Sequence, residues 1–181
     1  MPTDLLITTA TAADVSALVH LVNSAYRGEA STQGWTTEAH LLDGQRTDAA
    51  TLLDLLSPPD ATILKCTAPD GALLGSVYLQ HQAETLYLGM LSVAPTQQGR
   101  GIGKHLLQAA ENHAQQLGCG RMRITVISVR AELLAWYERH GYHRTGTTEP
   151  FPTDTRFGIP KQPLELLVLE KVLGVSQQLP N

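Results

Sequence analysis

The chain has 181 residues, of which 43% are hydrophobic, and a formal net charge of -4 at pH 7. This length and composition are typical of one folded domain, and we expect a single domain over residues 1–174 followed by a flexible tail at 175–181. The charge leaves no general excess of cationic side chains to neutralise a polyphosphate backbone, so nucleic acid is not an expected partner.

The amino-terminal part of the chain predicts one strand and a helical region. Residues 5–9 are rich in apolar and β-branched side chains, which favours a strand. Apolar side chains at helical spacing follow, and Thr11 or Asp14 is suited to cap the first helix. The first predicted helix ends near residue 25. Two shorter helices are predicted at 38–42 and 48–56. The proline pair in SPPD, residues 57–60, ends the last of them.

The middle of the chain predicts an antiparallel meander, with the turn signal APDG between its first two strands. The meander strands span residues 61–67, 72–81 and 85–93. A helix, a strand and a second helix follow at 101–117, 121–127 and 132–140, and Gly118 and Gly141 end the two helices. The last strands are expected at 142–147 and 164–170. This order predicts an α/β fold with helices flanking a mixed sheet.

The sequence carries no pattern for a membrane span, a disulfide framework or a metal site. No apolar run approaches the ~20 residues that cross a bilayer, and the amino terminus has no basic segment followed by an apolar stretch. Cys66 and Cys119 are the only cysteines, and HExxH, CxxC and GxSxG motifs are absent. We therefore expect a cytoplasmic protein with no membrane partner and no bound metal.

The strongest functional signal is the glycine-rich turn between the third meander strand and the helix that follows it. Gly99, Gly101 and Gly103 leave backbone amides uncovered by Cβ atoms, and the helix start adds about half a positive charge. Arg100 and Lys104 can add charge-assisted hydrogen bonds. The turn therefore predicts a site for a phosphate group.

Two other glycine-rich phosphate sites do not fit the spacing. A P-loop would require a glycine at Gln98 and a hydroxyl residue at His105. A dinucleotide fingerprint starting at Gly99 would require glycine at Lys104, and the preceding strands are joined as hairpins rather than opening a βαβ unit. The remaining pattern is QxxGxG, which runs from Gln98 to Gly103.

In this pattern the chain resembles the GCN5-related N-acetyltransferase (GNAT) superfamily, in which the turn wraps the pyrophosphate of acetyl-coenzyme A. YLGMLSVAPTQQGRGIGKHLLQAAE, residues 87–111, is similar to the family's fourth strand, pyrophosphate loop and third helix, and ELLAWYERHGYHRTG, residues 132–146, resembles a later helix. The resemblance implies a mixed, mostly antiparallel sheet of about seven strands, with splayed fourth and fifth strands. It also implies an N-acetyltransferase whose cosubstrate is acetyl-coenzyme A.

The resemblance implies that the pantetheine arm of the cofactor lies between the splayed strands and bonds the exposed backbone of the fourth. The amides of Leu91 and Val93 would bond the pantetheine, and Met90 or Leu91 would polarise the thioester carbonyl. The full set of implied cofactor residues is Met90, Leu91, Val93, Gln98, Gly99, Arg100, Gly101, Gly103, Lys104 and Tyr137.

Tyr137 is the predicted catalytic acid, because it stands four residues before Gly141 like the tyrosine that protonates the departing thiolate in many family members. A phenol with a pKa near 10 stays protonated at neutral pH. Tyr87 occupies the position where some family enzymes carry a basic glutamate, and we take Glu84 as the candidate base instead. The other titratable candidates are His81 and His143.

A second departure from the family pattern is Arg130, seven residues before Tyr137, where an asparagine often bonds the cofactor. Arginine has no acceptor atom, so it cannot accept a hydrogen bond from the cofactor as an asparagine can. A guanidinium at this position can instead meet a phosphate.

Acceptor specificity in the superfamily comes from segments that correspond to residues 26–38 and 149–163. The side chains available in these segments are the apolar Tyr26, Trp35 and Phe157, the anionic Glu29 and Glu38, and the cationic Arg27 and Arg156. Tyr87, outside both segments, is a further candidate for contact with the acceptor. Anionic groups would hold an amine and cationic groups a carboxylate. We expect a primary amine of a small or amino-acid-like molecule, while a peptide amino terminus and a lysine side chain stay open.

Several alternatives accompany this assignment. The matched motifs contain no cysteine that would impose a covalent intermediate, which favours direct transfer in a ternary complex. A non-catalytic acyl-coenzyme A sensor on the same fold, transfer to oxygen and transfer of a longer acyl group all stay open. A homodimer formed through the closing strands is also possible.

Overall fold

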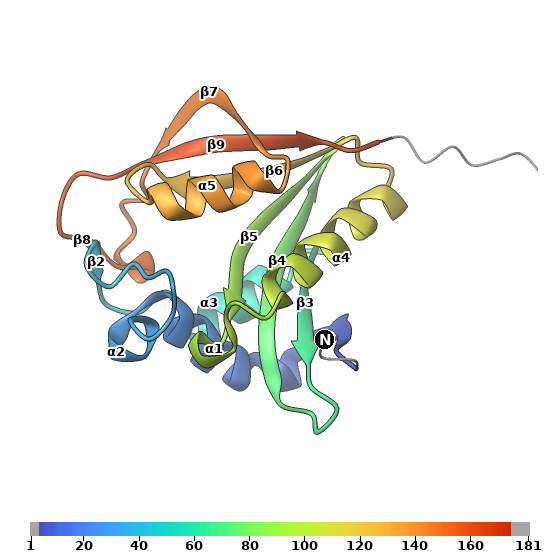
Figure 1. Cartoon of the computed structure of the whole chain (residues 1–181), viewed down its shortest axis with the longest axis horizontal. Coiled ribbons are helices and arrows are strands. Elements are labelled where there is room, and N and C mark those ends of the chain that lie inside the picture. The colour runs from blue at the N-terminus through green and yellow to red at the C-terminus, as the bar shows by residue number, and fades with distance from the viewer. Residues whose placement is uncertain (1–3, 175–181) are drawn as a thin grey trace, which may run out of the picture.

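The computed structural model describes residues 4–174, so the tail predicted at 175–181 lies outside the described residues. A seven-stranded sheet forms the centre of the molecule (Figure 1). Across the sheet the strands are β1 Leu6–Thr9, β3 Ala61–Thr67, β4 Leu73–Gln82, β5 Thr85–Val93, β6 Arg121–Ile127, β9 Glu165–Val172 and β7 His143–Pro150. Only β5 and β6 run parallel among these neighbours. The predicted mixed, mostly antiparallel sheet is therefore confirmed.

Helices cover both faces of the sheet. The α-helices are α1 Val15–Tyr26, α2 Gly28–Ser31, α3 Ala49–Leu56, α4 Ile102–Gln116 and α5 Ala131–Arg139. Short 3-10 turns lie at Ala12–Asp14, Pro95–Gln97 and Thr155–Phe157. Buried side chains of α1 and α3 pack on one face, and those of α4 and α5 pack on the other. No helix of residues 4–174 is long and apolar enough to cross a membrane.

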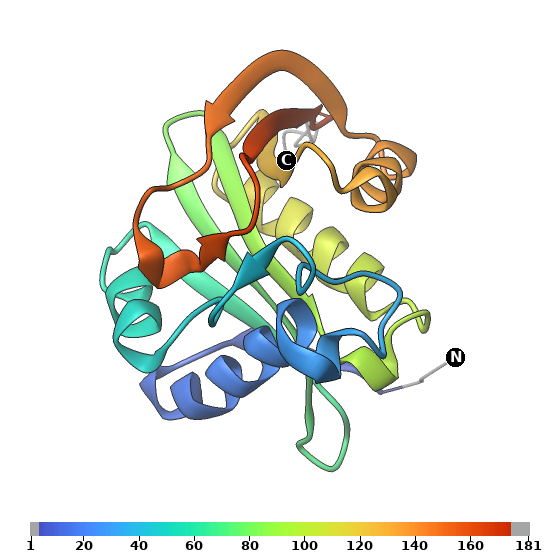
Figure 2. The same cartoon turned by 90° about the vertical axis from the view of Figure 1, so that its left-hand side faces the viewer.

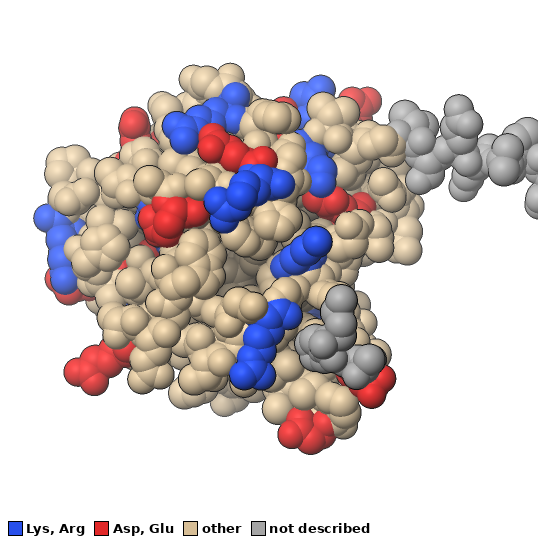
Figure 3. Space-filling model, viewed as in Figure 1, with Lys and Arg blue, Asp and Glu red and all other residues tan. Residues whose placement is uncertain are grey.

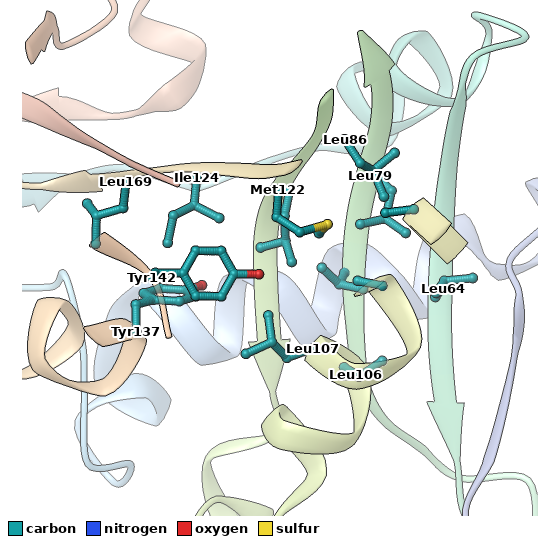
Figure 4. Close-up of a cluster of buried hydrophobic side chains, with 14 of the residues drawn as sticks. Leu64, Leu79, Leu86, Leu106, Leu107, Met122, Ile124, Tyr137, Tyr142 and Leu169 are labelled. Atoms are coloured by element: carbon teal, nitrogen blue, oxygen red, sulfur yellow. The ribbon is translucent and has the colours of Figure 1, made fainter. Parts of the chain in front are cut away.

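The larger core lies between the sheet and the α4–α5 layer (Figure 4). Leu106 and Leu107 of α4 lie in the same buried cluster as Met122 of β6, because apolar side chains recur along α4 at helical spacing. Tyr137 of α5 and the fully buried Tyr142, which follows the helix, close the same cluster. This packing holds α5 against the sheet and thereby sets the position of Tyr137.

The meander strands and the helices α4 and α5 begin and end within one residue of the predicted bounds, but the region after α1 differs. The predicted helix at 38–42 is wrong. The chain instead turns and forms the two-residue strand β2, Leu42–Asp43, which pairs with β8, Ile159–Pro160 (Figure 2). Leu41 and Leu42 are buried in a small cluster with Ile127, so long-range packing overrides the local helical pattern.

The splay predicted between the fourth and fifth strands of the sheet is present between β5 and β6 (Figure 1). These strands pair only from Thr85 with Arg121 to Tyr87 with Arg123, although β5 continues to Val93. On the other side of β5 the register with β4 shifts, and Met90 has a φ of +47°. A bulge of this kind bends a strand, so β5 turns away from β6 and a gap opens between them.

Candidate active site

The glycine-rich turn enters α4 through a left-handed backbone. Gly99 and Gly101 have φ values of +79° and +82°, where any side chain with a Cβ atom is strained. Among the described residues no heavy atom lies within 4 Å of the place a Cβ would take at either glycine. α4 begins at Ile102, directly after Gly101, so its free amides and its dipole face this open space. The geometry suits an anionic group.

Gln98 ties this turn to two other segments. Its side-chain Nε2 donates to the Val93 carbonyl at 3.1 Å, and its Oε1 accepts from the Trp35 amide at 2.9 Å. A Cβ atom at Gly34 would lie 2.3 Å from Oε1, so only glycine permits this approach. Gln98 therefore holds the segment after α2 against the start of the turn.

A cavity of about 450 Å³ lies beside the turn and extends to β5 and α5. We call it the first cavity. Among its lining residues are the predicted cofactor residues Leu91, Val93, Gln98, Gly99, Gly101, Gly103, Lys104 and Tyr137. Figure 3 shows Lys and Arg side chains on both sides of the hollow between α5 and the start of α4. Arg100 is exposed and does not line the cavity.

A second cavity, of about 210 Å³, lies in the gap between β5 and β6. It shares Tyr26, Leu91, Arg130, Leu133 and Tyr137 with the first cavity. The two cavities therefore meet at the splayed part of β5. The other walls of the second cavity include Arg46, Tyr87, Met90, Phe151 and Phe157.

Side chains donate hydrogen bonds to the backbone carbonyl groups of β5 that face the gap. The Tyr26 hydroxyl donates to the Leu91 carbonyl at 2.9 Å, as Gln98 does to Val93. The Ala94 amide, in contrast, donates to the Leu74 carbonyl at the β4 side of the strand. The backbone groups of successive residues in a strand point to alternate sides, so those of Val93 and Leu91 point away from β4. The amides of Leu91 and Val93 therefore face the gap, on the side where the sequence predicts the cofactor.

Tyr137 lies where the two cavities meet and is 5% exposed. Its ring packs edge-on against Trp136, with the centroids 5.0 Å apart, and against Tyr142 at 5.6 Å. Burial raises the pKa of the Tyr137 phenol far above its usual value of 10. The hydroxyl is therefore protonated at neutral pH, as an acid must be.

A buried ion cluster forms the wall beside Tyr26. Glu38, 6% exposed, lies between Arg27 and Arg130, with a closest N–O distance of 3.0 Å to each. Arg130 also donates to the Thr36 hydroxyl. The proposed roles of Glu38 toward an amine and of Arg27 toward a carboxylate are therefore not supported, because these groups bind each other. Arg130 likewise pairs with Glu38 rather than standing free for a phosphate.

The predicted acceptor residues separate into two groups. Tyr26 and Trp35 line the first cavity and Tyr26 and Tyr87 line the second. Glu29 on α2 is exposed and lines neither. Arg156 is also exposed and lines neither, since Asp154, which caps the turn Thr155–Phe157, holds its guanidinium at 2.7 Å. The structure does not bring Glu29 or Arg156 to the site.

Glu84, the predicted base, lies in the β4–β5 turn beyond the opposite end of β5. Its carbonyl accepts from the Gly120 amide at 2.9 Å, just before β6. Seven residues of extended chain separate it from Leu91, a span of about 23 Å. His81 and His143 also line neither cavity. The structure therefore brings none of the three predicted bases to the site.

Sequence reasoning missed several residues of the site. Arg46 lines the second cavity, and its segment carries no motif that would have drawn attention to it. Trp136 and Arg139 line the first cavity beside Tyr137, and their spacing on α5 was the available signal. Within residues 4–174 no group of three His, Cys, Asp or Glu side chains is arranged to hold a metal ion.

Comparison with known proteins adds family information to this geometry. The model of the Acetyltransferase (GNAT) family matches residues 18–142. Over 85 residues the chain is 29% identical to the streptothricin acetyltransferase of Streptomyces lavendulae, covering 46% of this chain and 45% of that protein. Over 92 residues it is 34% identical to the mycothiol acetyltransferase of Beutenbergia cavernae, covering 50% and 29%. The chain thus spans less than half of the length of either relative.

The fold has close counterparts among solved structures. PaiA N-acetyltransferase from Thermoplasma acidophilum, solved in complex with coenzyme A, aligns with a TM-score of 0.70 over 94% of this chain and 100% of that one, at 19% identity. At this identity the likeness concerns the fold. The family model, in contrast, matches the sequence itself from α1 to the end of α5 and covers both cavities' main walls. The chain belongs to the acetyltransferase (GNAT) family, whose members use acetyl-coenzyme A.

Proposed function

We propose that the protein is an acetyl-coenzyme A-dependent N-acetyltransferase that acts on a primary amine of a small or amino-acid-like molecule. The observation that carries this proposal is the meeting of two cavities at Leu91 and Tyr137. One cavity has an anion-binding turn at its end, and the other is separate from that turn. A cosubstrate and an acceptor can therefore approach one point from two sides.

The first cavity fits coenzyme A on the chemistry of its walls. The open, left-handed glycines beside the start of α4 offer amides to a pyrophosphate. Lys104 and Arg139 add positive charge at the same cavity. The gap-facing amide of Val93 suits a carbonyl group of a pantetheine arm, which would lie beside β5 as an added strand, and the Leu91 amide is left for the thioester carbonyl.

The bound cosubstrate supplies an acetyl group activated as a thioester. The Leu91 amide is placed to stabilise the negative charge that develops on the carbonyl oxygen. The amine nitrogen bonds to the acetyl carbon, the carbon–sulfur bond breaks, and the sulfur takes the Tyr137 proton. Solvent accepts the proton that the amine loses and later restores the one on Tyr137.

Direct transfer is favoured by the positions of the two cysteines. Cys66 and Cys119 are buried and line neither cavity. Burial raises the pKa of each thiol, so neither is an activated nucleophile. The amine therefore attacks the thioester in a ternary complex.

The second cavity favours the neutral, reactive form of the amine without a dedicated base. Glu38 is its only acidic lining residue, against Arg27, Arg46 and Arg130. Both Glu38 carboxylate oxygens already accept from the arginines. Positive surroundings lower the pKa of a bound amine, so the proton is lost more readily there than in water.

The first test is calorimetry with acetyl-coenzyme A, followed by measurement of thiol release with polyamines, amino acids, aminoglycosides, short peptides and streptothricin. Binding with thiol release on one acceptor class is the expected result. Binding without release on any acceptor would favour the acyl-coenzyme A sensor. Failure to bind would contradict the assignment of the Gln98–Lys104 turn.

The Gly101→Ala variant is expected to bind acetyl-coenzyme A about tenfold more weakly, because the φ of +82° at this position costs a non-glycine residue about 1–2 kcal/mol. Calorimetry measures the change. The Gly120→Ala variant is the control, since Gly120 lies outside both cavities and a Cβ there meets no described atom within 4 Å. Equal affinities in both variants would show that the turn does not need its left-handed conformation.

A further inference from the structure

We propose that the acceptor carries a carboxylate close to its reactive amine, and that Arg46 binds this carboxylate. The inference rests on the proposed function, since it concerns the acceptor of that reaction. It assigns the anion-binding role to a residue that no motif indicated, in place of Arg27 and Arg156.

The backbone places Arg46 at the second cavity. Asn23 of α1 accepts from the Arg46 amide at 2.8 Å and from the Thr47 amide at 3.1 Å, and it donates to the Thr47 carbonyl at 3.0 Å. These three bonds fix the segment between β2 and α3 against α1. The Arg46 side chain is half-buried and lines the cavity.

Two aromatic rings hold the Arg46 guanidinium. Its Cζ atom lies 5.6 Å from the centre of the Tyr26 ring and 6.0 Å from that of Phe157. Such contacts fix the orientation of the group while leaving its N–H donors free. Phe157 reaches this place because β8 pairs with β2 and because its carbonyl accepts from Arg27 at 2.9 Å.

The hydrogen bonds of the three cavity arginines separate their roles. All five N–H donors of Arg27 have acceptors, namely Glu38 and the carbonyls of Gly44, Gln45 and Phe157. The terminal nitrogens of Arg130 donate to Glu38 and Thr36. The Arg46 side chain donates to no described residue and forms no ion pair with one. The Arg130 Nε is also without a hydrogen-bond partner, but its terminal nitrogens are bound, so Arg46 is the arginine of the second cavity whose whole guanidinium is available to a ligand.

The charge balance also calls for an anion. The second cavity is lined by three arginines and one glutamate, and that glutamate lies between Arg27 and Arg130. The charge on Arg46 is therefore uncompensated. Burial lowers the pKa of the Arg27 guanidinium, and the Arg46 charge acts in the same direction. A bound carboxylate would relieve this repulsion, whereas a polycationic acceptor would increase it.

The position of Tyr26 limits the acceptor's length. One face of its ring contacts Arg46, and its hydroxyl bonds the Leu91 carbonyl where the two cavities meet. The anion and the reactive amine are therefore separated by about one phenol ring. With a volume of about 210 Å³, the second cavity is smaller than the typical drug-sized site and suits a single amino acid.

The test compares thiol release with L-amino acids, the matching L-amino acid amides and spermidine. The Arg46→Met variant keeps an unbranched apolar chain but removes the charge, and Arg46→Lys keeps the charge. Arg156→Met is the matched control, because Arg156 is exposed and lies outside both cavities. We expect kcat/KM to favour an acid over its amide by about 10- to 100-fold in the unchanged protein and the control. The preference should fall to near one in Arg46→Met and recover partly in Arg46→Lys.

A binding measurement separates this inference from the proposed function. Calorimetry on the coenzyme A complex compares N-acetyl-L-amino acids with their amides, and requires no turnover. Tighter binding of the acids that is lost in Arg46→Met supports the inference even if no amine is acetylated. A preference for amides or spermidine, an acid preference that survives in Arg46→Met, or the absence of acid binding in every assay would overturn it.

Discussion

Replacement of Tyr137 by phenylalanine is expected to lower kcat about 100-fold or more, while the dissociation constant of acetyl-coenzyme A changes little. The variant keeps the ring that packs against Trp136 and Tyr142 and removes only the hydroxyl at the meeting point of the two cavities. Thiol release at saturating acceptor measures kcat, and calorimetry measures affinity.

The control for this variant is Tyr142→Phe. Tyr142 is buried beside Tyr137, and its hydroxyl lies 3.5 Å from Glu111, away from both cavities. We expect its kcat to equal that of the unchanged protein. Because burial raises the pKa of the Tyr137 phenol, the acid stays protonated from pH 6 to 9, and its ionisation causes no loss of activity in that range. Equal turnover of Tyr137→Phe and the unchanged protein across this range would rule out the acid role.

Removal of the Glu38 carboxylate is expected to cause the largest loss of stability. In Glu38→Ala the guanidinium groups of Arg27 and Arg130 stay buried without their counter-ion. Breaking a buried ion pair by removing one partner costs about 3–5 kcal/mol. Urea unfolding followed by circular dichroism measures this decrease in the free energy of unfolding.

Glu29→Ala is the matched control, since it removes a carboxylate from the same region at an exposed position. Its free energy of unfolding should change by less than about 0.5 kcal/mol. A Glu38→Ala variant as stable as Glu29→Ala would mean that water or rearranged side chains compensate the two arginines. The buried ion pairs of Glu38 would then not be a main source of the protein's stability.

Local signals account for the predicted site residues that the structure brings together. A left-handed glycine, a free helix start and an apolar strand each depend on a few neighbouring residues, so the turn at Gln98–Lys104 was recognisable from its spacing. Tyr137 was recognisable for the same reason, because Gly141 ends its helix in a left-handed conformation, with a φ of +91°. The order of these elements then led to the family.

Long-range contacts account for the predicted residues that the structure does not bring to the site and for the wrong helix. Glu84 is only seven residues from Leu91 along the chain, but an extended strand carries it away from the cavities. The helix predicted at 38–42 does not form, because β2 pairs with β8 and Leu41 and Leu42 are buried in a tertiary cluster. Local patterns contain no information about such partners.

The sequence alone determined the family, the sheet order of a meander followed by a crossover, and the turn that suits a phosphate, since each follows from residues close together in the chain. Only the tertiary structure decided which charged side chains are available to a ligand. Glu38 binds Arg27, 11 residues away, and Arg130, 92 residues away, while Arg46 is left to face the second cavity. Charge pairing depends on distance in space, so the acceptor side of the site emerges only when the chain is folded.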